Sequence, residues 1–499
     1  MTADGTVSSP SIAAFPDVVA DRVASGARFC GLFASAQGED TRLIAVVAEA
    51  GSLDTEEVVV PAGVGRYPSL TPRVPAAAWY EREIRDLFGL HPHGHPRPDP
   101  LVFPLPSGSE RPRPGSGAAP GPIEPDLTPL DVHLAGEGVF TIPYGPVRSG
   151  VFEAVEYLVE TPGEDIPLVR TRVFYKHRGV ESRFEGMDVH DGVLLAERCE
   201  GVASVAHGIA FCGAVEELAG VELSAQAGLV RVLHAELERV ANHLDSTIRH
   251  TEAAGQAVAL ARLSLHKERV QRLRAQLCGS RFGRGVVVPG GVGGPPGLGA
   301  RDLGSAIGRL EGAILADTRL LLATPSFVDR LRETGVLAPA IAHRYSVLGP
   351  VGRGSGQSED VRFARPYAAY GRLGHQLLEP RDEGDALARQ RVRLDEIRGA
   401  FHLIRQAVDG LDGLGEPDRG AWQRTVREAS GEAIGWAEAP QGEVLYLVEL
   451  SEGRVVRVKP RSASFHNLAL FSSAFPNDIL TDFAFIEASF GLSIAGAAG

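Results

Sequence analysis

The sequence predicts an α+β protein in which a small N-terminal mixed α/β domain is joined by a linker to a helix-rich domain carrying a small β-hairpin element. Three observations support this prediction: short β-branched runs before residue 100, a proline-rich stretch after it, and long helical stripes of apolar residues beyond that stretch. The chain has 499 residues, of which 44% are apolar and 23% charged. It is therefore long enough to bury two or more hydrophobic cores.

The mixed α/β domain is predicted to occupy residues 1–103. Apolar or β-branched runs separated by glycine and charged residues predict strands at 28–34, 43–48 and 56–60. Residues 76–90 place Trp79, Ile84 and Leu87 on one face at helical spacing and predict a helix. The three histidines of HPHGHP follow directly, but its proline and glycine residues predict an irregular turn rather than a metal site.

Residues 104–136 are predicted to form an interdomain linker, because eight prolines with glycine and serine between them cannot keep a helix or a central strand. The helix-rich domain is predicted to occupy residues 137–499. Its clearest helix includes Val230, Leu233, Leu237, Val240 and Leu244, which recur at three- and four-residue steps. Two more long helices are expected at 260–277 and 303–322, and a β-hairpin at 446–450 and 455–458.

Composition excludes several classes of function. The formal net charge of −13 argues against a general nucleic-acid binder, which needs clustered lysine and arginine. The four cysteines stand too far apart for a zinc ribbon, an iron–sulfur run or a CxxC pair, so we expect no cluster held by this chain. A signal peptide and a run of roughly 20 apolar residues are both missing, so we expect partner subunits to supply any membrane attachment.

Two glycine-rich segments are candidate sites. PGGVGGPPG (289–297) lacks the order of a phosphate-binding loop, so a close backbone approach in a packed core is the stronger interpretation. GRGSGQSEDVRFARPY (352–367) contains Ser355, but no base stands near enough in sequence to make it a nucleophile. We expect Arg353, Asp360 and Arg362 of this segment to form a hydrogen-bonded network lining a cleft.

Several segments, in this order, resemble one family. WYEREIRDLFGLHPHGHP resembles the signature of the small α/β subunit of respiratory complex I. FYKHRGVE, LERVANHL, PGGV, GRGSGQSEDVRFARPY and GWAEAPQGE resemble the large, quinone-site subunit. A fusion of the two is typical of energy-converting group 4 [NiFe]-hydrogenases such as the formate hydrogenlyase large subunit. The resemblance implies a partner with a [4Fe–4S] cluster, membrane-arm subunits, and a position peripheral to the inner, cytoplasmic face of the membrane.

The chain departs from this family where nickel is bound. Two cysteine pairs hold nickel and iron in the hydrogenases, and the resemblance places Glu200, Ala203, Ser493 and Gly496 at those four positions. Cys199 stands one residue early. None of the four residues is a soft thiolate donor, so we expect no metal here. The chain stops three residues after Gly496, so no maturation tail is expected.

The resemblance to complex I implies a quinone held by a tyrosine and a histidine. Phe211 stands at the tyrosine position, and Arg148 and Ser149 stand near the histidine position in a shortened loop. A tightly bound quinone is therefore not expected, although a loose apolar pocket at Phe211 stays open. Gly293 replaces a histidine that in complex I senses the neighbouring cluster.

The predicted function is an oxidoreductase subunit that forms a scaffold and electron-transfer wall beside an iron–sulfur subunit, with a degenerate [NiFe] site. Two alternatives stay open: a subunit reducing quinone or another small acceptor, and a structural adaptor. The candidate catalytic groups are Glu200 and Glu487, whose carboxylates could relay protons unless an arginine such as Arg353 or Arg362 pairs with Glu200. The candidate cofactor-binding residues are His177, Arg178, Phe211, Arg353, Asp360 and Arg362.

Overall fold

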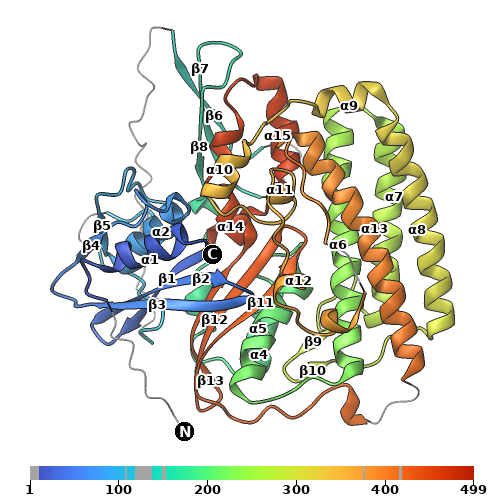
Figure 1. Ribbon diagram of the computed structural model, residues 1–499, viewed down its shortest axis with the longest axis horizontal. Coiled ribbons are helices and arrows are strands. Elements are labelled where there is room, and N and C mark those ends of the chain that lie inside the picture. The colour runs from blue at the N-terminus through green and yellow to red at the C-terminus, as the bar shows by residue number, and fades with distance from the viewer. Residues whose placement is uncertain (1–9, 107–108, 118–137, 149–152, 375–376, 415–418) are drawn as a thin grey trace. The chain divides into compact units, whose positions relative to one another are not determined.

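The computed structural model describes residues 10–106, 109–117, 138–148, 153–374, 377–414 and 419–499 (Figure 1). The chain divides into two compact units, Met1–Val132 with Arg344–Ser346, and His133–His343 with Val347–Gly499. Most of the predicted linker 104–136, and also Ser149, lies outside the described residues.

The first unit contains an antiparallel sheet of order β1-β2-β3. Its strands are β1 (Arg28–Gln37), β2 (Asp40–Glu49) and β3 (Ser52–Val60), so each predicted strand is present and longer than its apolar run. Helix α2 (Ala78–Phe88) packs on β1 and buries the predicted face. The unit also contains α1 (Phe15–Ala24) and a parallel pair formed by β4 (Arg66–Pro68) and β5 (His91–His93).

Two acidic residues of α2 are buried and bind backbone amides. Glu81 accepts hydrogen bonds from the amides of Leu70 and Thr71, and Asp86 accepts from those of residues 101–103. The Arg113 amide, in the predicted linker, donates to the Leu87 carbonyl at 2.9 Å. The first unit therefore extends beyond residue 103.

The second unit contains a bundle of four long helices: α6 (Ala225–Ala253), α7 (Ala257–Cys278), α8 (Ala300–Leu322) and α13 (Ala386–Gly413) (Figure 1). Leu233, Leu237, Val240 and Leu244 of the predicted stripe are buried in the core that these helices share, and Val230 is buried in a second core. Ser224 and Asp385 cap the N-termini of α6 and α13, since their side chains accept hydrogen bonds from the Ala227 and Ala388 amides.

The predicted β-hairpin is part of a three-stranded antiparallel sheet: β11 (Gly431–Ala439), β12 (Gly442–Ser451) and β13 (Arg454–Arg461). Helix α5 (Ser204–Leu218) packs on β11. The contact is so close that a Cβ on Gly435 would lie 1.9 Å from the Ala210 carbonyl oxygen, so only glycine fits there. A second antiparallel sheet contains β6 (Phe140–Tyr144), β7 (Glu156–Thr161) and β8 (Leu168–Arg172).

Short elements connect these layers. They are α3 (Val180–Phe184), α4 (Val189–Ala196), β9 (Val287–Val288), β10 (Gly291–Val292), α9 (Pro325–Leu331), α10 (Pro339–Arg344), α11 (Gly349–Arg353), α12 (Val361–Ala364), α14 (Ala463–Leu468), α15 (Phe483–Phe490) and α16 (Ile494–Ala498). In the PGGV segment, a Cβ on Gly291 would lie 2.1 Å from the Trp422 carbonyl oxygen, which confirms the predicted close backbone approach. Within the described ranges, no helix combines the length and apolar character needed to span a bilayer.

Candidate functional site

Glu200 is buried in the loop between α4 and α5, with 1% of its surface exposed. Its Oε1 accepts a hydrogen bond from Ser464 Oγ at 3.0 Å, and its Oε2 lies 3.3 Å from His207 Nε2. A Cβ on Gly496 would lie 2.6 Å from Glu200 Oε2. The Glu200 carboxylate therefore fills the space beside Gly496, so the structure brings together residues from both predicted ligand pairs.

His207 links Glu200 to Tyr446. The Tyr446 hydroxyl oxygen, on β12, lies 2.7 Å from His207 Nδ1, and both side chains are buried. Burial lowers the pKa of His207, but hydrogen bonds to Cys199 and Glu200 outweigh that effect and raise it to about 9. His207 is therefore an imidazolium at neutral pH, donating to Tyr446 and to Glu200. We call Cys199, Glu200, His207, Tyr446 and Ser464 the Glu200 cluster.

The other two residues at predicted ligand positions, Ser493 and Ala203, are both occupied by contacts within the protein. The Ser493 amide donates to Ser464 Oγ at 3.0 Å, and Ser493 Oγ donates to Glu153 Oε1 at 3.0 Å. Ala203 is completely buried at the start of α5. A carboxylate, two small apolar residues and a hydroxyl provide no soft thiolate, so these residues do not fit a nickel site of the four-cysteine kind that the resemblance implies. In the described part of the chain, no three histidine, cysteine, aspartate or glutamate side chains gather as a metal site.

Phe211, at the predicted quinone position, is completely buried. Its ring stacks on Phe184 at a centroid distance of 5.8 Å and lies edge-on to Tyr446 at 6.2 Å. The tip of the ring lies against Gly192, where a Cβ would come within 2.6 Å of Cζ. Phe211 is therefore a packing residue, and no exposed surface of its ring is available to line an apolar pocket.

His177 and Arg178 hold the C-terminal helix α16. His177 Nδ1 lies 2.7 Å from the Ala498 carbonyl oxygen, and the Arg178 amide donates to Gly499. Arg178 Nη2 donates to the Cys199 and Ala495 carbonyls at 2.6 and 3.0 Å. This arginine thus joins α16 to the loop that carries Glu200.

Arg353, Asp360 and Arg362 belong to a separate buried ionic network. We call it the Glu396 network; its members are Glu236, Arg239, His243, Arg353, Asp360, Arg362, Glu396 and Glu438. Arg353 Nη2 donates to Glu396 at 2.7 Å, and Arg362 Nη2 donates to Asp360 at 2.6 Å. The predicted network is thus present, but neither arginine pairs with Glu200, whose partners are His207 and Ser464.

The charge states within the network follow from burial and pairing. Burial opposes ionisation of Glu396, but Arg353 and His243 more than compensate and hold its pKa well below the usual range. Burial lowers the pKa of His243 to about 4 despite its hydrogen bond to Glu396. Neutral His243 therefore donates its Nε2 proton to a Glu396 carboxylate at 2.8 Å.

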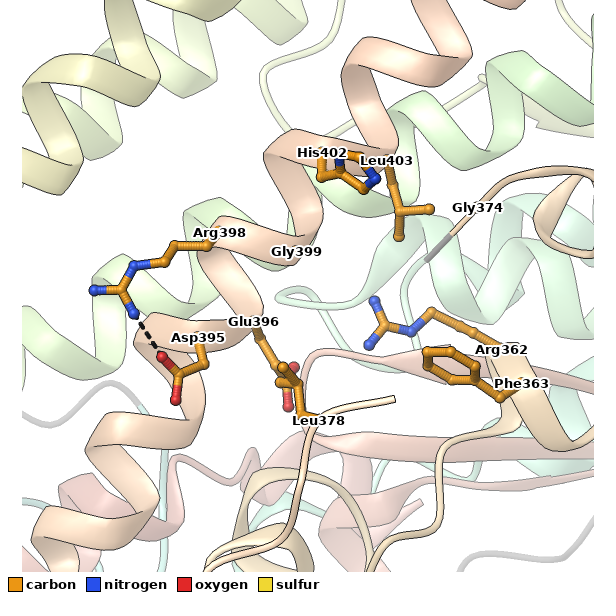
Figure 2. Close-up of a pocket in the computed structure, with 10 residues that line it drawn as sticks. All are labelled: Arg362, Phe363, Gly374, Leu378, Asp395, Glu396, Arg398, Gly399, His402 and Leu403. Carbon is orange, nitrogen blue, oxygen red and sulfur yellow. Dashed lines mark hydrogen bonds and ion pairs between the residues drawn. The ribbon is translucent and has the colours of Figure 1, made fainter. Parts of the chain in front are cut away.

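A pocket of about 740 Å³ adjoins this network (Figure 2). Arg362 and Glu396 line it together with Phe363, Gly374, Leu378, Asp395, Arg398, Gly399, His402 and Leu403. Arg398 and His402 are exposed, whereas Arg362 and Glu396 are buried. The expected cleft is therefore present. The buried network meets solvent at this pocket, where Arg398 and His402 are the exposed polar side chains.

Glu487, the second candidate catalytic carboxylate, lies on α15 in another contact set. Arg148 Nη2 donates to it at 2.7 Å, and the Tyr157 hydroxyl donates at 3.1 Å. The Arg148 guanidinium also covers the rings of Tyr144 and Tyr157. Glu487 is therefore paired with an arginine and makes no hydrogen bond to the Glu200 cluster.

Sequence reasoning missed His207, Tyr446 and Glu438. His207 ends the ERCEGVASVAH segment, so the segment offered a signal for it. Tyr446 and Glu438 were hidden because they lie on strands whose pairing brings them to α5 and α11.

Comparisons with known proteins give one consistent result. Residues 11–110 match the family model of the respiratory-chain NADH dehydrogenase 30 Kd subunit, and residues 255–429 and 420–497 match that of the 49 Kd subunit. Formate hydrogenlyase subunit 5 of Escherichia coli is 30% identical over 83% of this chain and 73% of its own length. The membrane-bound hydrogenase subunit alpha of Pyrococcus furiosus is 30% identical over 70% of this chain and 84% of its own.

The fold is also similar to a solved structure. A chain of the membrane-bound sulfane sulfur reductase, an archaeal respiratory membrane complex, aligns with a TM-score of 0.67 at 23% identity, covering 74% of this chain and 100% of that one.

Proposed function

Because this chain belongs to the family of fused complex I-type subunits that includes formate hydrogenlyase subunit 5, we propose that it is a subunit of a membrane-associated oxidoreductase complex without a [NiFe] centre. It forms a scaffold beside an iron–sulfur subunit that carries the electrons. The fused 30 Kd-like and 49 Kd-like regions support the assignment to such a complex. Membrane-arm subunits hold the complex at the membrane.

One observation carries the proposal that nickel is missing. The Glu200 carboxylate occupies the space next to Gly496, where the family resemblance places two of the nickel ligands. It is already bound by His207 and Ser464, so its oxygens are engaged by protein donors. Carboxylate oxygens are hard ligands and do not replace the soft thiolates that such a site requires.

The Glu200 cluster holds a proton instead of a metal. Protonated His207 lies between the Glu200 carboxylate and the Tyr446 hydroxyl, so the three side chains form a buried hydrogen-bonded chain. We propose that Glu200 is the carboxylate end of this chain, where its charged partner is His207 rather than an arginine. The quinone alternative has less support, because the completely buried ring of Phe211 offers no surface to an acceptor.

Arg178 is the proposed link to the iron–sulfur subunit. Its loop, HRG, also holds α16 and the backbone next to Glu200, so a subunit docked there lies close to the Glu200 cluster. Its guanidinium is held in place by the carbonyls of Arg198, Cys199 and Ala495, so a charge reversal at Arg178 would disturb both α16 and the proposed docking face.

Affinity purification of the tagged chain from detergent-solubilised native membranes tests the proposal. Mass spectrometry should identify an iron–sulfur subunit and hydrophobic membrane subunits in stoichiometric amounts. Arg178→Glu should reduce their recovery, whereas the matched charge reversal Arg269→Glu, at an exposed position of α7, should not. Isolation of the wild-type chain alone from native membranes would favour the structural-adaptor alternative and reject the complex.

A further inference from the structure

Glu438 is the least strongly bonded carboxylate of the Glu396 network. It lies on β11 and receives one guanidinium hydrogen bond, from Arg353 Nη1 at 3.1 Å, and one amide hydrogen bond, from Val361 at 3.3 Å. By contrast, Glu396 receives hydrogen bonds from Arg239, from His243 and, twice, from Arg353. The carboxylate with the fewest charged donors gains the least from ionisation.

The charges around Glu438 also favour its neutral form. The network has four carboxylates, Glu236, Asp360, Glu396 and Glu438, and three guanidiniums, Arg239, Arg353 and Arg362. His243 is neutral and therefore adds no positive charge to offset the fourth carboxylate. Arg393 also faces Glu396 and adds a positive charge there, although its guanidinium donates hydrogen bonds to the backbone carbonyls of Arg389 and Phe490 and to none of the four carboxylates in the described residues. Among the groups that the network joins by side-chain hydrogen bonds and ion pairs, negative charges therefore exceed positive ones by one.

Strand pairing adds a further acid beside Glu438. Glu443 of β12 lies directly opposite Glu438 in the antiparallel register, and like charges at such positions repel. Arg365 and Arg461 both contact Glu443 and hold its charge. Tyr367 also lies next to Glu438, and its hydroxyl oxygen accepts a hydrogen bond from the Glu438 amide.

The pocket next to the network is connected to Glu438 through Glu396 and Arg353. Figure 2 shows Glu396 and Arg362 at the pocket, with the ion-paired Asp395 and Arg398 on α13. Arg353 contacts Glu396 through Nη2 and Glu438 through Nη1, so a single guanidinium separates Glu438 from the pocket lining. A pocket of about 740 Å³, whose mixed lining includes the polar groups of Arg362, Asp395 and His402, has room for several water molecules.

We propose that Glu438 is a proton-binding site of this subunit and that protons reach it from solvent through the pocket lined by α12 and α13. On loading, a proton from pocket water bonds to a Glu438 carboxylate oxygen and hydroxide returns to solvent. On release, that O–H bond breaks, the proton returns to pocket water or hydroxide, and Arg353 again donates to the Glu438 carboxylate. The role in turnover rests on the proposed function, since electron transfer to an acceptor draws on such a proton.

The pKa of Glu438 is suited to taking up and releasing a proton near neutral pH. Burial and the neighbouring Asp360 raise its pKa to about 7, against the opposing effect of Arg353, Arg239 and Arg362. Glu438 is therefore protonated below neutral pH and ionised above it, and both forms are populated near pH 7.

Infrared difference spectroscopy of the full chain, between about pH 5 and about pH 9, tests the site itself because this range brackets the titration. The acidic form should show the carbonyl band of a buried carboxylic acid, titrating near neutral pH. Glu438→Gln should remove the Glu438 component of this band, while a component from Glu197, whose pKa burial also raises to about 7, should stay. Glu432→Gln is the matched control, because Glu432 lies on the same strand opposite Glu449 and outside the network. A band unchanged in Glu438→Gln would overturn the proposal.

The entry route is tested by filling the pocket. A Cβ on Gly399 would meet no atom within 4 Å, so Gly399→Phe places a ring in the pocket without backbone strain. After a pH jump, this variant should show slower appearance of the band with an unchanged midpoint. Gly413→Phe, on the same helix with equally open space, is the control. Equal rates in both variants would reject the pocket as the route. Subunit composition, measured separately, tests the proposed function.

Discussion

Adding one methyl group at Gly496 tests the packing of the Glu200 carboxylate. In Gly496→Ala the new Cβ would lie 2.6 Å from Glu200 Oε2 and 2.9 Å from its Cδ. Since ordinary contacts begin at 3.4 Å, the carboxylate must retreat by about 0.8 Å. Its hydrogen bonds to Ser464 and His207, at 3.0 and 3.3 Å, cannot both survive that movement. We expect a loss of about 2–4 kcal/mol in the free energy of unfolding, from overpacking and one weakened charged hydrogen bond.

A double-mutant cycle isolates this contact. Glu200→Ala should itself cost about 3–5 kcal/mol, because it leaves the buried His207 imidazolium without a counter-ion. In that background Gly496→Ala should cost only about 1 kcal/mol, from its contact with Ser462 Oγ at 3.0 Å, giving an interaction energy of about 1–3 kcal/mol. Gly213→Ala, at a helical position with no atom within 4 Å of the added Cβ, should instead stabilise by about 0.5–1 kcal/mol. Urea unfolding measures all four variants. Equal costs of Gly496→Ala in both backgrounds would refute the reasoning.

Three further predictions concern the same core. Phe211→Tyr should destabilise by about 1–3 kcal/mol in urea unfolding, because its hydroxyl would be forced against Gly192 in a buried site; a neutral effect would contradict the packing. The pKa of His207 is raised from 6.5 to about 9, so its stabilisation is complete below the unfolded pKa and is lost as the pH rises through about 9. His207→Asn should therefore cost more at pH 6 than at pH 9.5, and a cost that grows with pH would reject the ion pair. Arg231→Met should cost about 3–5 kcal/mol by leaving buried Glu216 unpaired, which thermal unfolding can check.

Sequence reasoning worked well where a periodic pattern reports on burial. The stripe of α6 and the strands β1 to β3 are all visible in the order of apolar residues, because each side chain packs against the nearest layer. The carboxylates of Glu81 and Asp86 break this rule. They lie on the buried side of α2, because backbone amides from other segments satisfy them, and those segments cannot be identified from the helix alone.

The candidate site was predicted in part. The segment GRGSGQSEDVRFARPY predicted Arg353, Asp360 and Arg362 as network residues. The structure joins them to Arg239 and His243 of LERVANHL and to Glu438 of GWAEAPQGE. The segments are therefore linked by one ionic network, which the order of residues does not show. The partner of Glu200 was missed for the same reason, since the choice between His207 and an arginine depends on how α5 packs on β11 and β12.

The nickel content of the native complex tests the central claim most directly. Elemental analysis should be made on the complex purified from cells grown with nickel and an active [NiFe] maturation system. We predict iron from the partner subunit but far less than one nickel per chain, because Glu200, Ala203, Ser493 and Gly496 offer no thiolate. One nickel per chain would contradict the account, since the Glu200 carboxylate and a nickel ion cannot occupy the same space beside Gly496.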